Sequence, residues 1–249
     1  MGSSPGAAAA ALLRRGVAMT ACLVCAVPLA RGADAVPAAE PKFQLFSGTD
    51  LWREGGFLYG GVVWSPAGLY RQGFALKVMA GAGEYRFHSG ALATDVLGHV
   101  TQGFVTPGWR FKAEHLEITV FAGLDAQQHR LTPDDPSAGL RGSYLGARAE
   151  IDVWYEPSKT TMIAADASLS TIGHSYCGRL AYGWKLRDAF YVGPEMQTMG
   201  SANYSAVRAG LHITAWHAGK TEWSAAAGFM QDSDDRQGLY GRLGMLWRR

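Results

Sequence analysis

Hydrophobic and polar side chains alternate along most of the chain beyond residue 42, with the two-residue period of a strand that has one apolar face. In residues 142–156, for example, every odd-numbered position from Leu145 to Tyr155 is apolar, and the even-numbered positions carry the charges. No window keeps the three- and four-residue spacing of an amphipathic helix for three turns. The pattern therefore predicts an all-β protein.

The alternation predicts about twelve strands, separated by clusters of Gly, Pro, Asp and Ser that are typical of turns. The expected strands cover residues 43–52, 56–65, 72–87, 100–111, 114–127, 141–156, 160–171, 175–187, 189–198, 203–215, 220–230 and 238–248. The long polar connections, at 88–97, 128–140 and 231–237, are the third, fifth and eleventh, whereas the even-numbered connections are short. Outer-membrane barrels have an even number of strands, short turns at one end and longer loops at the other. This order indicates an up-and-down antiparallel outer-membrane β-barrel; a count of ten strands also fits.

A membrane barrel and a soluble β-sandwich both contain alternating strands, and two features favour the barrel. Many of the expected strands are longer than the roughly 9–11 residues that a tilted membrane-spanning strand needs. Trp and Tyr also recur near strand ends, which predicts aromatic girdles at both membrane interfaces. These side chains are Trp52, Trp64, Tyr70, Trp109, Trp154, Tyr155, Trp184, Tyr191, Trp216, Trp223, Tyr240 and Trp247. A secreted soluble β-protein is the alternative.

The N-terminal segment has the features of a secretory signal peptide. Arg14-Arg15 provides a basic segment, residues 16–29 are apolar but too short to span a bilayer, and Ala33-Asp34-Ala35 provides a cleavage site. A short N-terminal membrane anchor is the alternative. The expected domains are a signal peptide at 1–35, a Pro/Ala-rich linker at 36–42 and a β-barrel domain at 43–249. Without its signal peptide the chain has equal numbers of basic and acidic side chains, so charge gives no reason to expect nucleic acid as a partner.

A glycine–proline pair interrupts the alternating segment at 189–198. Proline cannot donate a hydrogen bond to a neighbouring strand, and a closed barrel has no edge strand on which to place it. We therefore expect Pro194 to lie at a β-bulge with its ring toward the lipid. Glu195, the next residue, would then point into the lumen, where Arg208 or Arg148 could neutralise it.

The expected strand at 141–156 places the most concentrated set of polar and aromatic side chains on a single inward face. The set consists of Tyr144, Arg148, Glu150, Asp152 and Trp154. Aromatic rings can stack on sugar rings, while carboxylates and arginine can bond sugar hydroxyls. These residues, together with Glu195 and Arg208, are therefore candidate contacts for a glucan. The alternative for the same residues is a lumenal network of ion pairs with girdle aromatics, in a barrel that leaves little room for a channel.

No motif for nucleotide binding or nucleophilic catalysis is found in an appropriate context. The sequence has no P-loop and no G-x-S-x-G, and its glycine-rich segments lie on expected strands. His174 and Ser175 are adjacent and would face opposite ways on a strand, so they cannot form a dyad with each other. Ser175 or Ser143 with another histidine is the alternative that would make the protein an enzyme. The Asp-rich turns at 134–135 and 232–235 are either solvated or able to bind Ca²⁺; we predict no metal site and no cofactor.

Several segments, in order along the chain, resemble the cellulose biosynthesis protein BcsS family. They include FSGTDLW at 46–52, GFLYGGVVWSPAGL at 56–69 and YGWKLRDAFYVGPE at 182–195. The similarity runs from about Phe43 to the C-terminus. It implies an exported accessory protein of bacterial cellulose synthase systems, with a role in secretion or assembly of a β-glucan. The resemblance supplies no catalytic residues.

Together, the pattern and the resemblance predict a non-enzymatic outer-membrane barrel that assists cellulose biosynthesis or export. The expected partners are outer-membrane lipids, the cellulose chain and other components of the cellulose synthase complex, with no nucleic acid. Two alternatives from other functional classes are a barrel hydrolase or acyltransferase that acts on envelope lipids, and a small-solute porin.

Overall fold

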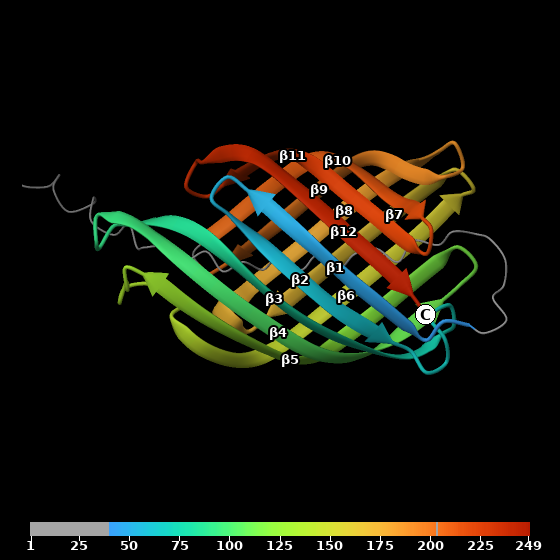
Figure 1. Cartoon of the computed structure of the whole chain (residues 1–249), viewed down its shortest axis with the longest axis horizontal. Coiled ribbons are helices and arrows are strands. Elements are labelled where there is room, and N and C mark those ends of the chain that lie inside the picture. The colour runs from blue at the N-terminus through green and yellow to red at the C-terminus, as the bar shows by residue number, and fades with distance from the viewer. Residues whose placement is uncertain (1–39, 203) are drawn as a thin grey trace, which may run out of the picture.

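Twelve antiparallel strands close into one barrel in the computed structural model, which describes residues 40–202 and 204–249 (Figure 1). The strands are β1 (Phe43–Trp52), β2 (Gly55–Trp64), β3 (Gly73–Ser89), β4 (Thr94–Lys112), β5 (Leu116–Thr132), β6 (Gly142–Ser158), β7 (Thr161–Ser170), β8 (Ser175–Leu186), β9 (Phe190–Ser201), β10 (Tyr204–Ala218), β11 (Thr221–Asp232) and β12 (Gln237–Arg248). Each strand pairs with the next along the chain, and β12 pairs with β1. The predicted up-and-down barrel and its strand count are confirmed. The predicted signal peptide and most of the predicted linker lie outside the described residues.

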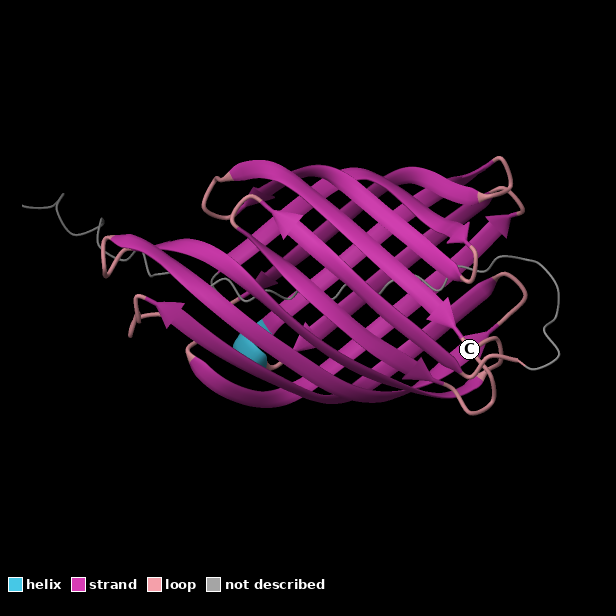
Figure 2. Cartoon of the chain, in the orientation of Figure 1, coloured by secondary structure: helices cyan, strands magenta, loops and turns pink. Residues whose placement is uncertain are grey.

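A short 3₁₀ turn, η1 (Ile172–His174), is the single helical element in the described part of the chain (Figure 2). Within residues 40–202 and 204–249, no helix is long and apolar enough to cross a membrane.

Side chains on each strand alternate between the interior and the exterior of the barrel, as the pleat of a strand requires. On β6, Glu150 is buried inside while its neighbour Ile151 is exposed outside. On β10, Arg208 is buried inside and Leu211 is 64% exposed on the outer surface. Large exposed apolar side chains cover the exterior from strand to strand, which is the composition expected of a surface in contact with lipid.

The barrel is taller on one side, because its strands differ in length (Figures 1 and 2). β3 to β6 each contain 17 or 19 residues, whereas the remaining strands contain 10 to 15. We call β3–β6 the tall wall, and β7–β12 with β1 and β2 the low wall. The end at which the chain enters β1 and leaves β12 is the terminal end. The tall wall projects beyond the low wall at the opposite end.

The tall wall corrects the predicted connection at 88–97, because β3 and β4 both extend into that segment. The outward side chains of the extension are mostly polar, with Glu84, His99 and Arg130 side by side in one row across three strands and Leu97 as an apolar exception. The inward side chains include the fully buried Tyr85. The polar outer face gives this segment the composition of a loop, although the strand alternation continues through it.

Two connections fold inward rather than standing away from the barrel. Residues 133–141 join β5 to β6 at the opposite end and bury Leu140. Residues 65–72 join β2 to β3 at the terminal end and bury Leu69, whose carbonyl oxygen accepts a hydrogen bond from Arg110. The expectation that the even-numbered connections are all short is therefore wrong for the second one, because it is long enough to place Leu69 under the barrel.

Pro194 does not lie at a β-bulge, contrary to the expectation. β9 keeps one register with β10 through Gly193 and Pro194, and one register with β8 on both sides of a gap in the ladder. In that register Pro194 faces Tyr182, whose carbonyl oxygen lacks the backbone N–H that a residue other than proline would donate. His212 Nε2 lies 3.1 Å from this oxygen and can supply the missing donor. The barrel thus replaces a backbone hydrogen bond by a side-chain one, without an extra residue.

The aromatic girdles of Trp and Tyr that were expected at both interfaces do not form as predicted, since Tyr191 and Tyr240 are buried and the outward tryptophans lie at one end only. Every outward tryptophan lies near the terminal end: Trp64, Trp109, Trp184, Trp216, Trp223 and Trp247. Trp52 and Trp154 instead are buried in the interior. At the opposite end the large outward side chains are mostly aliphatic: Leu51, Leu58, Leu145, Leu169 and Leu239.

Candidate functional site

All of the predicted site residues point into the barrel. Those of β6 run from Tyr144, near the opposite end, to Trp154, near the terminal end, while Glu195 and Arg208 come from β9 and β10. The buried members are Arg148, Glu150, Trp154, Glu195 and Arg208, and the half-buried members are Tyr144 and Asp152. The charged members fall into two clusters and a separate pair formed by Arg208, and the two aromatic members contact other rings.

The first cluster joins β6 to β3 within the tall wall. Lys77 Nζ lies 2.8 Å from Glu150 Oε2 and 3.0 Å from Asp152 Oδ2. Arg148 Nε lies 2.5 Å from Glu150 Oε1. The Lys77 ammonium is also 4.4 Å from the centre of the Phe121 ring, where the face of the ring attracts a cation. Arg148 Nη1 also lies 3.9 Å from Oδ2 of the buried Asp125 on β5. Two cations therefore hold three carboxylates within this wall.

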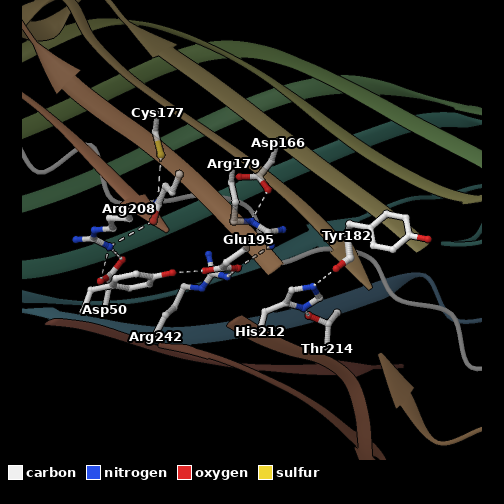
Figure 3. Close-up of polar contacts among 12 residues, drawn as sticks. Asp50, Asp166, Cys177, Arg179, Tyr182, Glu195, Arg208, His212, Thr214 and Arg242 are labelled. Atoms are coloured by element: carbon white, nitrogen blue, oxygen red, sulfur yellow. Dashed lines mark hydrogen bonds and ion pairs between the residues drawn. The ribbon is translucent and has the colours of Figure 1, made fainter. Parts of the chain in front are cut away.

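Glu195 is the centre of the second cluster, in the low wall (Figure 3). Its carboxylate lies 2.7 Å from Arg242 Nη2, 3.1 Å from the Tyr240 hydroxyl and 3.5 Å from Arg179 Nη1. Arg179 Nε in turn lies 2.8 Å from Asp166 Oδ2. These contacts join β7, β8, β9 and β12, so the cluster around one carboxylate connects four strands of the low wall.

Arg208 pairs with Asp50 of β1 rather than with Glu195. Its Nη1 atom lies 2.8 Å from each Asp50 carboxylate oxygen and 3.3 Å from Gln197 Oε1. The expectation that Arg208 or Arg148 neutralises Glu195 is therefore wrong. Each of those arginines has a nearer carboxylate of its own, because the closure of the barrel brings β1 and β10 together across the interior.

The two aromatic candidates meet other rings edge to face. Trp154 is buried, with its ring centre 5.9 Å from that of Tyr191 and the planes 75° apart. Tyr144 stands in the same way 6.2 Å from His129, and its hydroxyl bonds the backbone of Arg141. Tyr144 is half-buried and is therefore the more accessible of the two for stacking on a sugar.

Lys77, Arg179 and Asp50 complete these clusters, and sequence reasoning did not single them out. Each is a charged residue flanked by apolar or small neighbours, and each occupies one of the alternate strand positions whose side chains point inward. This alternation is the signal that could have identified them. Their partners could not be identified in this way, because no pattern along one strand specifies which strands meet across the interior.

The structure does not join the candidate serines to a histidine. In the described part of the chain no hydrogen bond links Ser143 or Ser175 to an imidazole, and the Ser175 Oγ atom is buried without a partner. Thr214 Oγ1 lies 2.9 Å from His212 Nδ1 (Figure 3). Because the other nitrogen of that ring bonds the Tyr182 carbonyl, His212 links the strands beside Pro194.

Arginine side chains pair with the Asp-rich turns. Arg141 lies 2.7 Å from Asp134, and Arg236 lies 2.9 Å from Asp232 and 3.0 Å from Asp234. Within residues 40–202 and 204–249, no group of three His, Cys, Asp or Glu side chains is arranged to hold a metal ion.

Comparison with known proteins gives a family and a fold. A family model described as "Cellulose biosynthesis protein BcsS" matches residues 44–249. A search of curated proteins finds no match.

Solved structures similar to this chain are barrels. The translocator domain of the autotransporter NalP from Neisseria meningitidis is 10% identical, with a TM-score of 0.51 over 84% of this chain and 89% of that one. A TodX deltaS2S3 mutant monoaromatic hydrocarbon channel is 9% identical, with a TM-score of 0.50 over 84% of this chain and 90% of that one. At these identities the likeness concerns the fold alone.

Proposed function

The chain belongs to the cellulose biosynthesis protein BcsS family, and from that premise we propose that it is an outer-membrane barrel that helps cellulose reach or stay at the cell surface. We further propose that it does so without making or breaking a covalent bond. Its association with cellulose biosynthesis rests on the family, and its location and mechanism rest on the physical arguments below.

The exterior of the barrel supports a location in a membrane. Outward side chains such as Leu180 and Leu211 are more than half exposed among the residues that the structure describes. In a soluble protein, this continuous apolar surface would be exposed to water on every strand, and soluble monomers rarely expose apolar patches of that size. A closed barrel satisfies its backbone hydrogen bonds internally, which permits it to sit in hydrocarbon.

The observation that carries the non-enzymatic reading is the mutual pairing of the interior charges. Glu150 is held by Lys77 and Arg148, and Glu195 by Arg179 and Arg242. A catalytic acid or base needs a reacting group within hydrogen-bond reach and an orienting partner behind it. Here the partners are other fixed charges, which is the arrangement of a structural network.

We propose that any glucan contact in this interior is distributed over the inward face of β6. Tyr144, Arg148, Glu150, Asp152 and Trp154 form one line along that strand, and Glu195 and Arg208 extend the polar surface on β9 and β10. A net hydrogen bond contributes about 1 kcal/mol. Each contact would therefore be weak, and no single residue would be essential to guide the polymer.

Deletion of the gene tests this function. We expect exported or surface-retained cellulose to fall, while the synthase in isolated inner membranes keeps its full activity. Trp154→Ala or Glu150→Gln, each in a barrel that still folds, should give a partial loss. Normal cellulose in the deletion strain would contradict the proposal. Complete loss from one Ser or His substitution in a folded barrel would favour the envelope-lipid enzyme.

A further inference from the structure

The terminal end of the barrel combines tryptophan with exposed basic side chains. Trp64, Trp109 and Trp184 lie at this end of β2, β4 and β8, and further outward tryptophans lie on β10, β11 and β12. Trp216 and Trp223 face each other across β10 and β11. The indole rings therefore surround most of the circumference at one height. Amphipathic rings of this kind prefer the boundary between hydrocarbon and headgroups.

Every lysine of the chain except Lys77 lies at this same end: Lys42, Lys112, Lys159, Lys185 and Lys220. Several basic side chains of the terminal end are exposed and form no salt bridge with any residue that the structure describes. They are Lys42, Lys159, Arg187, Lys220 and Arg249. They lie before β1, in the turns β6–β7, β8–β9 and β10–β11, and after β12, so they follow the barrel wall in an arc from β6 to β1. Exposed acidic side chains at this end are fewer and include Glu114, in the turn β4–β5, and Asp188, beside Arg187.

The opposite end has no outward tryptophan, and its exposed basic side chains without a salt bridge to a described residue, Arg86 and Arg130, lie together on the extension of the tall wall. Its large outward side chains are mostly leucines, and its last turn, between β11 and β12, is rich in aspartate. Along the tall wall, the outward face changes there from apolar residues to Glu84, His99 and Arg130, where opposite charges are mixed. The two ends therefore present different chemistry to the two faces of a membrane.

We infer that the terminal end binds anionic phospholipid headgroups through the ring of tryptophans and the arc of basic side chains at the same end. The arc follows eight of the twelve strands, and the outward tryptophans continue beyond it to β2 and β4. A ligand that contacts all of these side chains must follow the curved outer wall, as lipid does because it surrounds a barrel completely. Tryptophan fixes the depth, and the long lysine side chains reach the phosphates from that depth. The inference does not depend on the proposed role in cellulose export.

The test uses the native tryptophans as reporters. The full barrel is folded into vesicles of phosphatidylcholine and phosphatidylglycerol in which one lipid or the other carries brominated acyl chains, and quenching gives the relative association of the two lipids. K159Q/K220Q removes two exposed charges from the terminal end, and R86Q/R130Q removes two from the extension of the tall wall. None of these four side chains forms a salt bridge with a described residue, so both variants should fold.

We expect the unmodified barrel to prefer phosphatidylglycerol. A basic side chain close to an anionic surface changes association by about fivefold, so K159Q/K220Q should lose about fivefold or more of that preference at low salt. R86Q/R130Q should keep it within about twofold. Equal quenching by the two lipids in the unmodified barrel, or equal effects of the two variants, would overturn the inference. Relief of quenching by soluble glycerophosphoglycerol would also overturn it, because the arc would then be a site for free phosphate esters rather than for a lipid surface.

Discussion

The tall wall and the low wall have the same strand chemistry at the height of the membrane and differ above it. In the low wall, large apolar side chains such as Leu169, Phe229 and Leu239 continue on the outward face almost to the ends of the strands, and the interior charges meet around Glu195 and Asp50. In the tall wall, a charged layer around Lys77 lies below a second layer in which Tyr85 is buried and the outward face is polar. We infer from this difference that the extension stands in water on its outer side.

A sheet that leaves the membrane needs a covered inner face, because one polar face alone does not stabilise strands. Residues 133–141 provide part of this cover, since Leu140 packs with Ile172 and Ala138 packs against the buried inward side chains. In the described part of the chain, the low wall has shorter connections at the same end, of which the one that contains η1 buries Ile172. We therefore interpret the two walls as one membrane barrel that carries a small water-exposed sheet on one side.

The largest effect is expected at the centre of the low-wall cluster. Glu195→Gln should lower the free energy of unfolding by about 3–5 kcal/mol, because Arg179 and Arg242 then remain buried beside a neutral amide. Urea titration of the barrel in lipid vesicles, followed by tryptophan fluorescence, measures the change.

The control for this substitution is Glu84→Gln on the outside of the tall wall. Glu84 pairs with His99 in an exposed position, so its loss should cost less than about 1 kcal/mol. Adding Arg242→Met to Glu195→Gln should recover part of the loss, because one uncompensated charge is removed. Equal costs for the two glutamates would mean that the low-wall cluster is as solvated as the outer surface.

The next effect separates the membrane height from the extension. Leu180, in the middle of β8, and Thr132, in the extended part of β5, are both exposed on the outer surface. Leu180→Arg should cost about 2–4 kcal/mol, the cost of an arginine near the middle of a bilayer. Thr132→Arg should change stability by no more than about 0.5 kcal/mol, as at other water-exposed surface positions. Urea titration in vesicles measures both; equal costs would place both walls in the same medium.

A smaller effect is expected at the proline of the low wall. His212→Ala should cost about 1–3 kcal/mol, because the Tyr182 carbonyl oxygen loses its donor. In that variant Pro194→Ala should recover most of the loss, since an N–H at position 194 can restore the ladder. In the native barrel, Pro194→Ala should raise the free energy of unfolding by less than it does in the His212→Ala variant. A double-mutant cycle measures this difference. Additive effects of the two substitutions would show that His212 does not replace the backbone donor.

Much of the fold could be predicted from the sequence, because every strand has lipid on one side and a packed interior on the other. That asymmetry gives the alternation from which the inward direction of Glu150 and Arg208 follows. The partners of these charges could not be predicted, because Lys77–Glu150 and Arg208–Asp50 join strands whose approach depends on the closure and stagger of the barrel. The accommodation of Pro194 was missed for the same reason, since His212 belongs to another strand.

The smallest effect concerns the cover of the tall wall and depends on pH. Burial alone would raise the pKa of Asp135, but hydrogen bonds from Ser137 and Ser89 hold that pKa below its ordinary value. The Ser89 bond fastens residues 133–141 to the end of β3. Because the folded state favours the carboxylate, the stabilisation from the hydrogen bonds to Asp135 is fully present above the ordinary aspartate pKa of about 4. It is lost as the pH falls through the lower pKa that Asp135 has in the folded state.

A spin label introduced at exposed Gly139 (G139C) should therefore be immobile at pH 6 and mobile at strongly acidic pH. Asp135→Asn removes the charge, so we expect the label to be mobile at both pH values in that variant. Asp134→Asn serves as the control, because Asp134 only pairs with Arg141 at the surface, and it should behave as the native barrel does. If the mobility of the label does not change with pH in the native barrel, packing of Leu140 alone holds residues 133–141 in place. The Asp135 carboxylate would then not be needed to hold this segment against the tall wall.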